Sequence, residues 1–336
     1  MSTSSSTPSS SIQRGARRGR IGVGLIAVIV VAVLAGGGIA AYYLFFRAAG
    51  PEIVRVDGSS TVFPITSAWA ADFNDPSRQV IVAFSGTGGG FQKFCRGETD
   101  LSDASRPIRA SEIDDCTARN VTGIVEFLAA YDGLSLVVPQ SNTWVQSLTV
   151  SELCRIWTSN TSAGACGGTG GRVTTWQQLN ASWPNQAIGL YGPGTDSGTF
   201  DYFVEVILGN DPSEHTDQYF ASENDNELVQ GVASDPNGLG YFGYAYAIEN
   251  TATLRILAID GGAGPVSPTS ATIRDGTYAP LSRPLYVYGS ARSLSRQVVQ
   301  DFLGFAYTDR GTSLVDLTGY VSLTVAERAE QLLKLP

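Results

Sequence analysis

Short apolar runs alternate with amphipathic segments along most of this chain. Four runs have the length and the β-branched content of strands: EIVRVDG, QVIVAFSG, GLSLVVP and PLYVYGS. Five segments carry apolar residues at helical spacing: VFPITSAWAADFN, GFQKFCRGE, TVSELCRIWT, SRQVVQDFLGFAYT and TVAERAEQLLKL. Because strands alternate with helices, the pattern predicts an α/β fold for the body of the chain.

The first 50 residues depart from this pattern. Residues 1–20 are poor in apolar groups and predict a disordered, basic cytoplasmic tail. Residues 21–46 carry no charge, and as a helix they would reach about 39 Å, enough to cross a hydrocarbon core ~30 Å thick. We favour an uncleaved transmembrane anchor over a signal sequence, whose apolar core is usually shorter. Both alternatives, anchored at the cell membrane or periplasmic or secreted after cleavage, place residues 51–336 outside the cytoplasm.

The charge of the body argues against binding to nucleic acid. The chain has 22 Lys and Arg against 31 Asp and Glu, and residues 1–50 hold five of the arginines and no acid. Subtracting these five leaves 17 basic and 31 acidic residues, a net charge of -14, for residues 51–336. A nucleic-acid-binding domain would normally carry a basic face.

The four cysteines suit an oxidising compartment. They form no C-x-x-C motif, and the single histidine, His215, has no metal-ligand spacing to them, so we expect no metal site. Pairing of nearest neighbours predicts the disulfides Cys95–Cys116 and Cys154–Cys166. The sequence does not choose among the three connectivities, and four buried free thiols remain an alternative.

Three turns rich in serine, threonine and glycine each lead into an apolar or amphipathic segment. They are DGSSTVFPIT (57–66), FSGTGGGFQKF (84–94) and GTDSGTFDYF (194–203). Hydroxyls cap helix N-termini, glycine lets the backbone approach a ligand, and the first turn of a helix has free N–H donors. Three such turns in one chain predict a site where helix N-termini converge on an anion.

A fourth segment, TDLSDASRPI (99–108), adds two charged side chains. Arg106 could offer a planar fork to an oxyanion. Asp103 would repel an anion unless the ligand carries a proton to donate to it, as hydrogen phosphate does near neutral pH and sulfate does not. The alternative is that Asp103 caps a local turn and that Arg106 pairs with a surface acid.

Four of these motifs together resemble one family. VDGSSTVFPIT, SGTGGGFQKFCRGETDLSDASRPI, GPGTDSGTFDYF and DPNGLGYFGYAY are similar, in the same order, to the phosphate-binding proteins of bacterial phosphate ABC transporters, of the PstS/SphX type. The resemblance covers roughly residues 52–330. It implies a type II periplasmic-binding-protein fold with lobes at 51–133 plus 286–336 and at 134–285.

The resemblance also implies the ligand and its contacts. Inorganic phosphate would be captured between the lobes and delivered to membrane permease subunits by a monomer without a cofactor. The implied ligand residues are Ser59, Ser60, Thr61, Ser85, Gly86, Thr87, Asp103, Arg106, Ser197, Gly198 and Thr199. One position departs from the family, because Pro193 stands where some members carry an arginine. We assign that guanidinium to Arg106.

The motif TDSGT could also belong to an enzyme, because it is similar to the nucleophile motif of chymotrypsin-type proteases. That fold needs its histidine well before the serine, whereas His215 lies 18 residues after Ser197 in a polar loop, where we expect it to be solvated. A metallophosphatase would need several histidines. We therefore predict that Ser197 donates a hydrogen bond and does not attack. A phosphoryl hydrolase or a phosphate sensor on a similar scaffold remains the alternative.

Overall fold

The computed structural model describes residues 51–162, 166, 171–195 and 197–336. The predicted cytoplasmic tail (1–20) and the predicted anchor or signal sequence (21–46) lie outside the described residues. Within the part of the chain that is described, no helix is long and apolar enough to cross a membrane.

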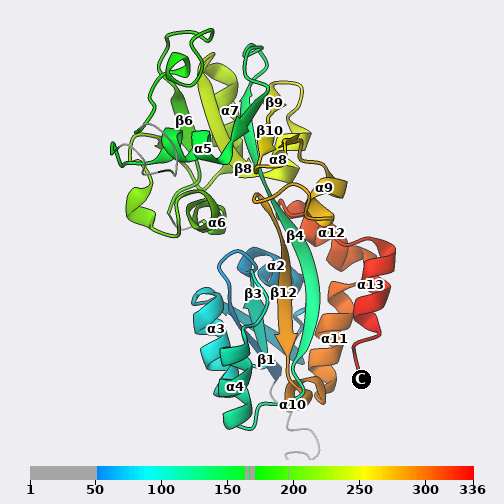
Figure 1. Ribbon diagram of the computed structural model, residues 1–336. Coiled ribbons are helices and arrows are strands. Elements are labelled where there is room, and N and C mark those ends of the chain that lie inside the picture. Colours follow the sequence, from blue (N-terminus) through cyan, green and yellow to red (C-terminus); the bar gives the residue numbers. More distant parts are fainter. Residues whose placement is uncertain (1–50, 163–165, 167–170, 196) are drawn as a thin grey trace, which may run out of the picture. The chain divides into compact units, whose positions relative to one another are not determined.

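The described chain forms two α/β lobes (Figure 1). In the first lobe, strands β1, β2 and β3 run parallel, and β12 is antiparallel to β3 and β4. Helices α3 and α4 cover one face of this sheet, while α2, α11 and α12 cover the other. The elements are β1 (Glu52–Gly58), α2 (Phe63–Phe73), β2 (Arg78–Phe84), α3 (Gly86–Cys95), β3 (Leu101–Ala104), α4 (Ala110–Ala118), β4 (Val125–Pro139), β12 (Ser282–Gly289), α10 (Ala291–Leu294), α11 (Gln297–Ala306), α12 (Asp309–Leu317) and α13 (Val325–Leu332).

The second lobe continues the same sheet and adds a small one. Strands β6 and β8 are parallel, β8 and β9 are antiparallel to β4, and β5, β10 and β11 form a separate sheet. The elements are β5 (Ser147–Thr149), α5 (Val150–Trp157), η1 (Trp176–Gln178), β6 (Gly189–Gly192), α6 (Gly198–Ile207), η2 (Pro212–Glu214), β7 (Phe220–Ala221), α7 (Asp225–Ser234), β8 (Gly238–Gly243), α8 (Tyr244–Glu249), β9 (Leu254–Ile256), β10 (Ala258–Asp260), β11 (Pro265–Val266) and α9 (Ser270–Arg274).

Strand β4 joins the two lobes. Its first part, up to Gly133, pairs with β12, and from Leu134 onwards it pairs with β8. The chain returns to the first lobe through β12, beside β4 (Figure 1). These pairings confirm the predicted two-lobed α/β architecture, while the residues at which we divided the lobes remain a prediction.

Capping residues begin several helices where the sequence pattern predicts. Thr149 Oγ1 accepts a hydrogen bond from the Glu152 N–H (3.1 Å), and the Glu152 carboxylate accepts one from the Thr149 N–H (2.8 Å). Thr324 and Glu327 make the same reciprocal pair at α13. Each pair satisfies two backbone donors that the first turn leaves free.

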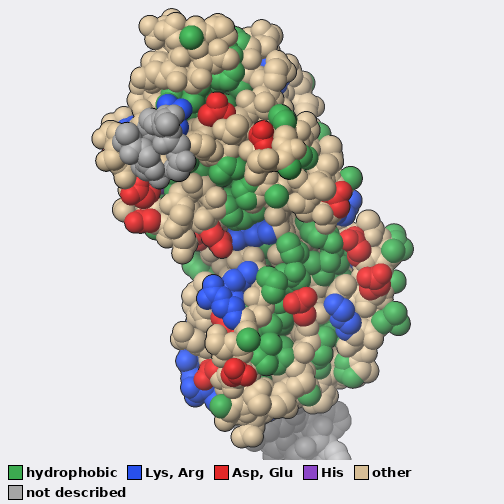
Figure 2. Space-filling model, viewed as in Figure 1, with side chains coloured by type: hydrophobic (Ala, Val, Ile, Leu, Met, Phe, Trp, Pro, Cys, Tyr) green, Lys and Arg blue, Asp and Glu red, His purple; other side chains and the backbone are tan. Residues whose placement is uncertain are grey.

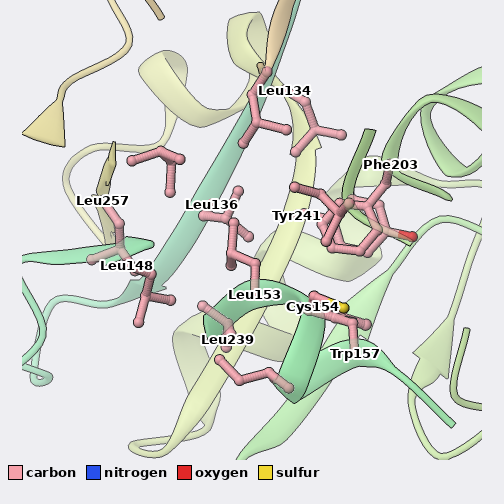
Figure 3. Packing of buried hydrophobic residues seen from close by; sticks show 14 of the residues in the cluster. Leu134, Leu136, Leu148, Leu153, Cys154, Trp157, Phe203, Leu239, Tyr241 and Leu257 are labelled. Atoms are coloured by element: carbon pink, nitrogen blue, oxygen red, sulfur yellow. The ribbon is translucent and has the colours of Figure 1, made fainter. Parts of the chain in front are cut away.

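Each lobe has its own hydrophobic core. In the second lobe, the aliphatic side chains of β4 and β8 meet α5 and α6, and Phe203 stacks on Tyr241 with ring centroids 4.2 Å apart (Figure 3). Trp157 meets the same tyrosine edge-on at 4.8 Å. Fully burying one such side chain is worth roughly 1.5–3 kcal/mol, so these clusters stabilise each lobe.

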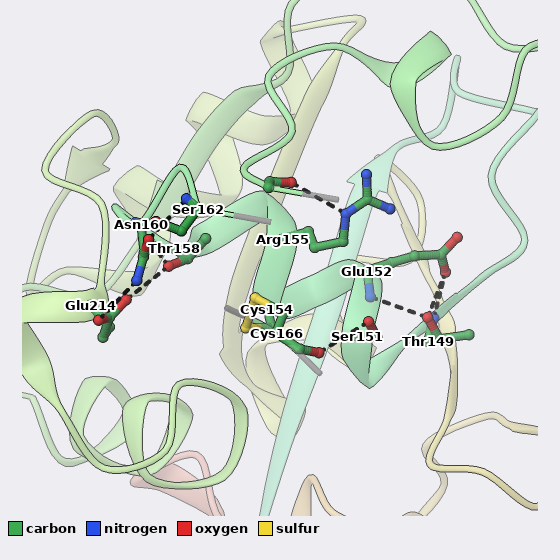
Figure 4. The surroundings of a disulfide bond; sticks show 11 residues. Thr149, Ser151, Glu152, Cys154, Arg155, Thr158, Asn160, Ser162, Cys166 and Glu214 are labelled. Carbon is green, nitrogen blue, oxygen red and sulfur yellow. Dashed lines mark hydrogen bonds between the residues drawn. A yellow bond between two sulfur atoms is a disulfide. The ribbon is translucent and has the colours of Figure 1, made fainter. Parts of the chain in front are cut away.

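Two disulfides cross-link neighbouring segments, with the predicted pairing. Cys95 at the end of α3 is bonded to Cys116 in α4, and Cys154 in α5 is bonded to Cys166. Figure 4 shows the second bond beside the α5 capping box, with the Ser151 hydroxyl donating to the Cys166 carbonyl (3.3 Å). Closing loops of 21 and 12 residues stabilises the fold by roughly 3 kcal/mol each in the chain-entropy model.

Candidate functional site

A cavity of about 300 Å³ lies where the two lobes meet. The loops after β1, β2 and β3 line it from the first lobe, α6 and the following loop line it from the second, and Arg283 reaches it from β12. Figure 2 shows basic and acidic side chains gathered at this junction. The lining residues are Ser59, Ser60, Thr61, Gly86, Thr87, Ser105, Arg106, Arg109, Asp201, Val204, Glu205, Asn210, Pro212 and Arg283.

The first predicted turn connects β1 to α2 at the floor of the cavity. Ser59 and Thr61 are buried, and Ser59 Oγ accepts the Thr61 N–H at 3.2 Å. Gly58 precedes them because the backbone of β3 comes too close for a side chain. A Cβ there would lie 2.0 Å from the Asp103 carbonyl oxygen. This close approach brings the first turn beside Asp103.

The second turn connects β2 to α3. Ser85 stands at the N-cap position of α3, but its side chain makes no capping hydrogen bond and instead donates to Asp57 Oδ1 at 2.5 Å. Lys93 pairs with the other oxygen of Asp57 at 2.6 Å. Thr87 Oγ1 lies 3.1 Å from the Ser105 hydroxyl and also accepts the Ser105 N–H. The first turn of α3 therefore faces the loop after β3.

Asp103 lies in β3 and is completely buried. The Thr66 hydroxyl donates to Asp103 Oδ2 at 2.7 Å, and Oδ1 has no hydrogen-bond partner among the residues described. Burial raises the pKa of this carboxyl to about 7, with Thr66 opposing the shift and the charge of Asp57 adding to it. A buried carboxylate oxygen without a partner is costly, so a donor brought by a ligand would be stabilised here.

The third turn begins α6 in the opposite lobe. Ser197 Oγ accepts the Thr199 N–H at 3.2 Å as an N-cap. Gly198 lies directly against the first turn, because a Cβ at this position would be 2.6 Å from Thr61 Cα. The Ser60 hydroxyl also donates across the junction to Asp201 at 3.0 Å. The N-terminus of α6 thus meets the first turn, as the sequence pattern predicts.

Arg283 is a cavity residue that sequence reasoning missed. Its Nη2 donates to Thr61 Oγ1 (3.1 Å), its Nη1 to Glu205 (2.9 Å) and its Nε to Asp132 (3.3 Å). The guanidinium lies 3.6 Å from the ring centroid of Tyr202. Burial raises the pKa of Asp132, and Arg283 opposes that shift. The only signal in the sequence was an arginine at the start of a strand-like run, which does not reveal what lies opposite.

Arg106, the arginine we assigned to the ligand, lines the cavity but is already paired. Its Nη1 and Nη2 donate to the two oxygens of Glu112 at 2.9 and 2.8 Å. Glu112 in turn accepts the Arg109 N–H as part of a capping box. To bind an anion, Arg106 would have to share or leave this fork–fork pair.

His215 is buried, which corrects the expectation of a solvated loop residue. Only 7% of its surface is exposed, because Trp157, Phe200 and Tyr219 surround the ring. Its two nitrogens lie at hydrogen-bond distance from the Thr216 carbonyl and the Tyr241 hydroxyl, and burial lowers its pKa. Alternation of polar residues along a loop does not reveal an aromatic pocket supplied by distant segments.

The predicted residues fall into three groups. Those that line the cavity are Ser59, Ser60, Thr61, Gly86, Thr87 and Arg106. Ser85 and Asp103 sit behind this lining, and Ser197, Gly198 and Thr199 start the helix that meets it. Within the described ranges, no group of His, Cys, Asp and Glu could hold a metal ion. The arrangement offers hydroxyls, helix N-termini and a guanidinium, which can bind an oxyanion.

Comparison with known proteins places this geometry in context. Residues 47–310 match the family model of the PBP superfamily domain. The chain is 41% identical over 275 residues to protein SphX from Synechocystis, covering 81% of this chain and 79% of that one. It is 36% identical over 292 residues to the phosphate-binding protein PstS from Staphylococcus saprophyticus, covering 85% of each. A crystal structure of a possible phosphate binding protein from Planctomyces limnophilus is 41% identical, with a TM-score of 0.77, and covers 85% of this chain and 98% of its own.

Proposed function

Since the chain belongs to the PBP superfamily and to its branch of PstS and SphX phosphate-binding proteins, we propose that it binds one inorganic phosphate ion between its lobes. It then delivers the ion to the permease subunits of an ABC-type phosphate importer. The family consists of solute-binding proteins of phosphate transport and not of enzymes.

One observation carries the choice of phosphate over other anions. Asp103 is buried next to the first Ser/Thr turn, and its Oδ1 has no partner among the described residues. An anion site with an ionisable carboxylate inside it suits a ligand that brings its own proton. Hydrogen phosphate brings a P–O–H donor, and sulfate at neutral pH does not.

The binding groups act without a covalent step. Hydroxyls of Ser59, Ser60, Thr61 and Thr87 donate to phosphate oxygens, together with the free N–H groups of the first turns of α3 and α6. The Ser85 hydroxyl joins them once it turns away from Asp57, to which it donates in this structure. Gly86, Gly198 and Thr199 contribute their backbone at the same helix starts, and Ser197 adds a hydroxyl. The macrodipoles of three helices stabilise the negative charge, so an acidic protein holds an anion with few formal cations.

The lobes divide the work of binding. We place one lobe at residues 51–133 plus 286–336 and the other at 134–285, so that the first two turns and the third turn approach the ion from opposite sides. The change of partner along β4 at Gly133 and Leu134 supports the first of these boundaries. Phosphate would hold the lobes together by contacting both, and the closed form would be the one that the permease recognises.

The chain acts outside the cytoplasm as a monomer. Residues 21–46 tether it to the cell membrane, or direct its export if they are removed. A tether keeps the binding domain close to its permease, which raises the local concentration of loaded protein at the transporter.

Titration calorimetry of the purified full chain with phosphate and with sulfate tests the function. We expect one phosphate to bind per chain and sulfate to bind far more weakly at pH 8, where Asp103 is ionised. Equal affinity for both ions, or heat from sulfate alone, would contradict the proposal.

Gly198→Ala tests whether lobe closure contributes to phosphate binding. Its methyl group would lie 2.6 Å from Thr61 Cα, so the lobes could not close without a shift of the backbone. We expect phosphate affinity to fall roughly tenfold, the cost of about 1.4 kcal/mol of strain in the closed form. Gly304→Ala is the control, because Gly304 lies in α11 with open space around it, and it should leave the affinity unchanged. Gly209→Ala is not suitable, because Gly209 has a positive φ that an alanine would adopt only with strain.

A further inference from the structure

A second cavity, of about 610 Å³, lies at the other end of the first lobe. Ile53 and Arg55, from the beginning of β1, line it, whereas the phosphate turn follows the end of that strand. A strand of seven residues separates the two places by roughly 20 Å. The second cavity is therefore independent of the proposed phosphate site.

The charge around this cavity is unusual for the chain. Five of its lining residues are arginines: Arg55, Arg96, Arg119, Arg292 and Arg296. Residues 51–336 contain only 17 basic residues against 31 acidic ones, and Asp100 is the single acid in the lining. An acidic protein has thus gathered almost a third of the cations of its body around one cavity.

Three of the five arginines have local roles. Arg96 and Arg119 cap the C-termini of α3 and α4, where the macrodipole favours a cation, and they pair with Glu98 and Asp115. Arg296 pairs with Asp100 at 2.6 Å and also donates to the Ile53 carbonyl. These contacts explain part of the cluster without a ligand.

Arg55 and Arg292 are exposed, and Arg292 lies in the last turn of the short helix α10. Neither makes an ion pair with any residue that the structure describes. The hydroxyl of Thr99, in the same lining, is buried and likewise has no hydrogen-bond partner in the described chain. The cavity therefore offers two unneutralised guanidinium groups and further donors to an incoming acceptor.

The walls of the cavity are held in place. Cys95 directly precedes Arg96, and Cys116 lies three residues before Arg119. The disulfide between these cysteines therefore links the two segments that carry the arginines. Ser290 and Ser293, which are both buried, hydrogen-bond each other on the opposite side, next to Arg292. The backbone that carries the arginines is therefore fixed, and only their side chains have to order when an anion binds.

From this geometry we infer that the cavity binds a phosphate-bearing anion, either a phospholipid headgroup or a soluble phosphate compound such as pyrophosphate. Planar guanidinium groups bind such oxyanions through paired hydrogen bonds. The cavity is too open and too rich in charge for an apolar ligand.

Modification of arginines by phenylglyoxal tests the inference on the full chain, with peptide mass mapping to follow each arginine. One arm adds pyrophosphate to the protein in a detergent solution whose buffer contains no phosphate. The other compares bilayers of phosphatidylcholine with and without phosphatidylglycerol. We expect Arg55 and Arg292 to react about tenfold more slowly when a bound anion is present at ~10 times its dissociation constant.

The outcomes separate the two sources. Protection by pyrophosphate alone assigns the cavity to soluble phosphate compounds, and protection by phosphatidylglycerol alone assigns it to a headgroup. The double variant Arg55→Gln/Arg292→Gln should abolish the protection of Arg96, while Arg310→Gln, which removes an exposed arginine paired with Asp72, should not. No protection in either arm, or protection of Arg96 that survives the double variant, overturns the inference.

Discussion

Replacing Arg283 with glutamine is expected to weaken phosphate binding by roughly ten- to one-hundred-fold, the worth of about 1.5–3 kcal/mol for a hydrogen bond to a charged group. We propose that Arg283, rather than Arg106, supplies the guanidinium that Pro193 cannot. It lines the cavity beside Thr61, and it reaches there from β12, the strand by which the chain returns to the first lobe.

The partners of Arg283 in this structure indicate which of its contacts a ligand could replace. Glu205 is half exposed, so its pair with Nη1 is worth only ~0–1 kcal/mol and can give way to phosphate. Asp132 is buried and holds Nε at 3.3 Å, and Tyr202 lies under the guanidinium plane. Asp132 and Tyr202 thus orient the guanidinium, and Glu205 is the partner that an anion would replace.

Calorimetry must separate lost binding from lost folding. Arg283→Gln alone leaves Asp132 buried without its cation, which costs about 3–5 kcal/mol of stability. The double variant Asp132→Asn/Arg283→Gln removes both charges, and its thermal unfolding should stay close to that of the parent. Glu205→Gln serves as the matched control, with phosphate affinity equal to the parent or slightly higher.

If the folded double variant binds phosphate as tightly as the parent, Arg283 does not contact the ligand. Arg106→Gln then becomes the decisive substitution. Because Arg106 is held by both oxygens of Glu112, we expect it to have the smaller effect of the two.

Asp103→Asn is expected to change the choice of anion more than the affinity for phosphate. Loss of the O–H···carboxylate bond should weaken phosphate by about 1.5–3 kcal/mol at most, and the asparagine amide, which can donate, should recover part of it. Sulfate should gain, because the carboxylate that opposes its lone pairs is gone. Ser197→Ala is the control, because its hydroxyl serves either anion and its loss should weaken both in similar proportion.

The pH dependence of sulfate binding gives a second readout of Asp103. The pKa of the buried carboxyl is raised to about 7, so it is ionised above that pH and protonated below it. A protonated Asp103 can donate to sulfate. The parent should therefore bind sulfate more tightly as the pH falls through 7, or through a somewhat higher pH if the bound anion raises the pKa further. Asp103→Asn should show no such step.

Calorimetric titrations with both anions at several pH values decide this prediction. An unchanged phosphate-to-sulfate ratio in Asp103→Asn, at pH 8, would mean that Asp103 does not accept the phosphate proton. The unpartnered Oδ1 would then need another explanation.

Local patterns in the sequence were enough to predict the strands and helix starts that carry the site residues. Short apolar runs predicted β1 and β2, and hydroxyl–glycine turns predicted the starts of α3 and α6, where Ser85 and Ser197 stand at the N-cap positions. Both disulfides join cysteines that are neighbours along the chain. Such features depend on residues within a few turns of each other, and a linear pattern records them.

The tertiary structure alone decided which charged groups face the cavity. Arg283 and Thr61 are 222 residues apart and meet because β12 returns beside β4. Gly198 touches Thr61 because the two lobes close on each other, and His215 is buried because aromatic side chains from other segments surround it. Arg106 pairs with Glu112, a residue of the capping box that begins α4. Burial and long-range pairing set the partner of each charge, and neither is encoded in the spacing of residues along the chain.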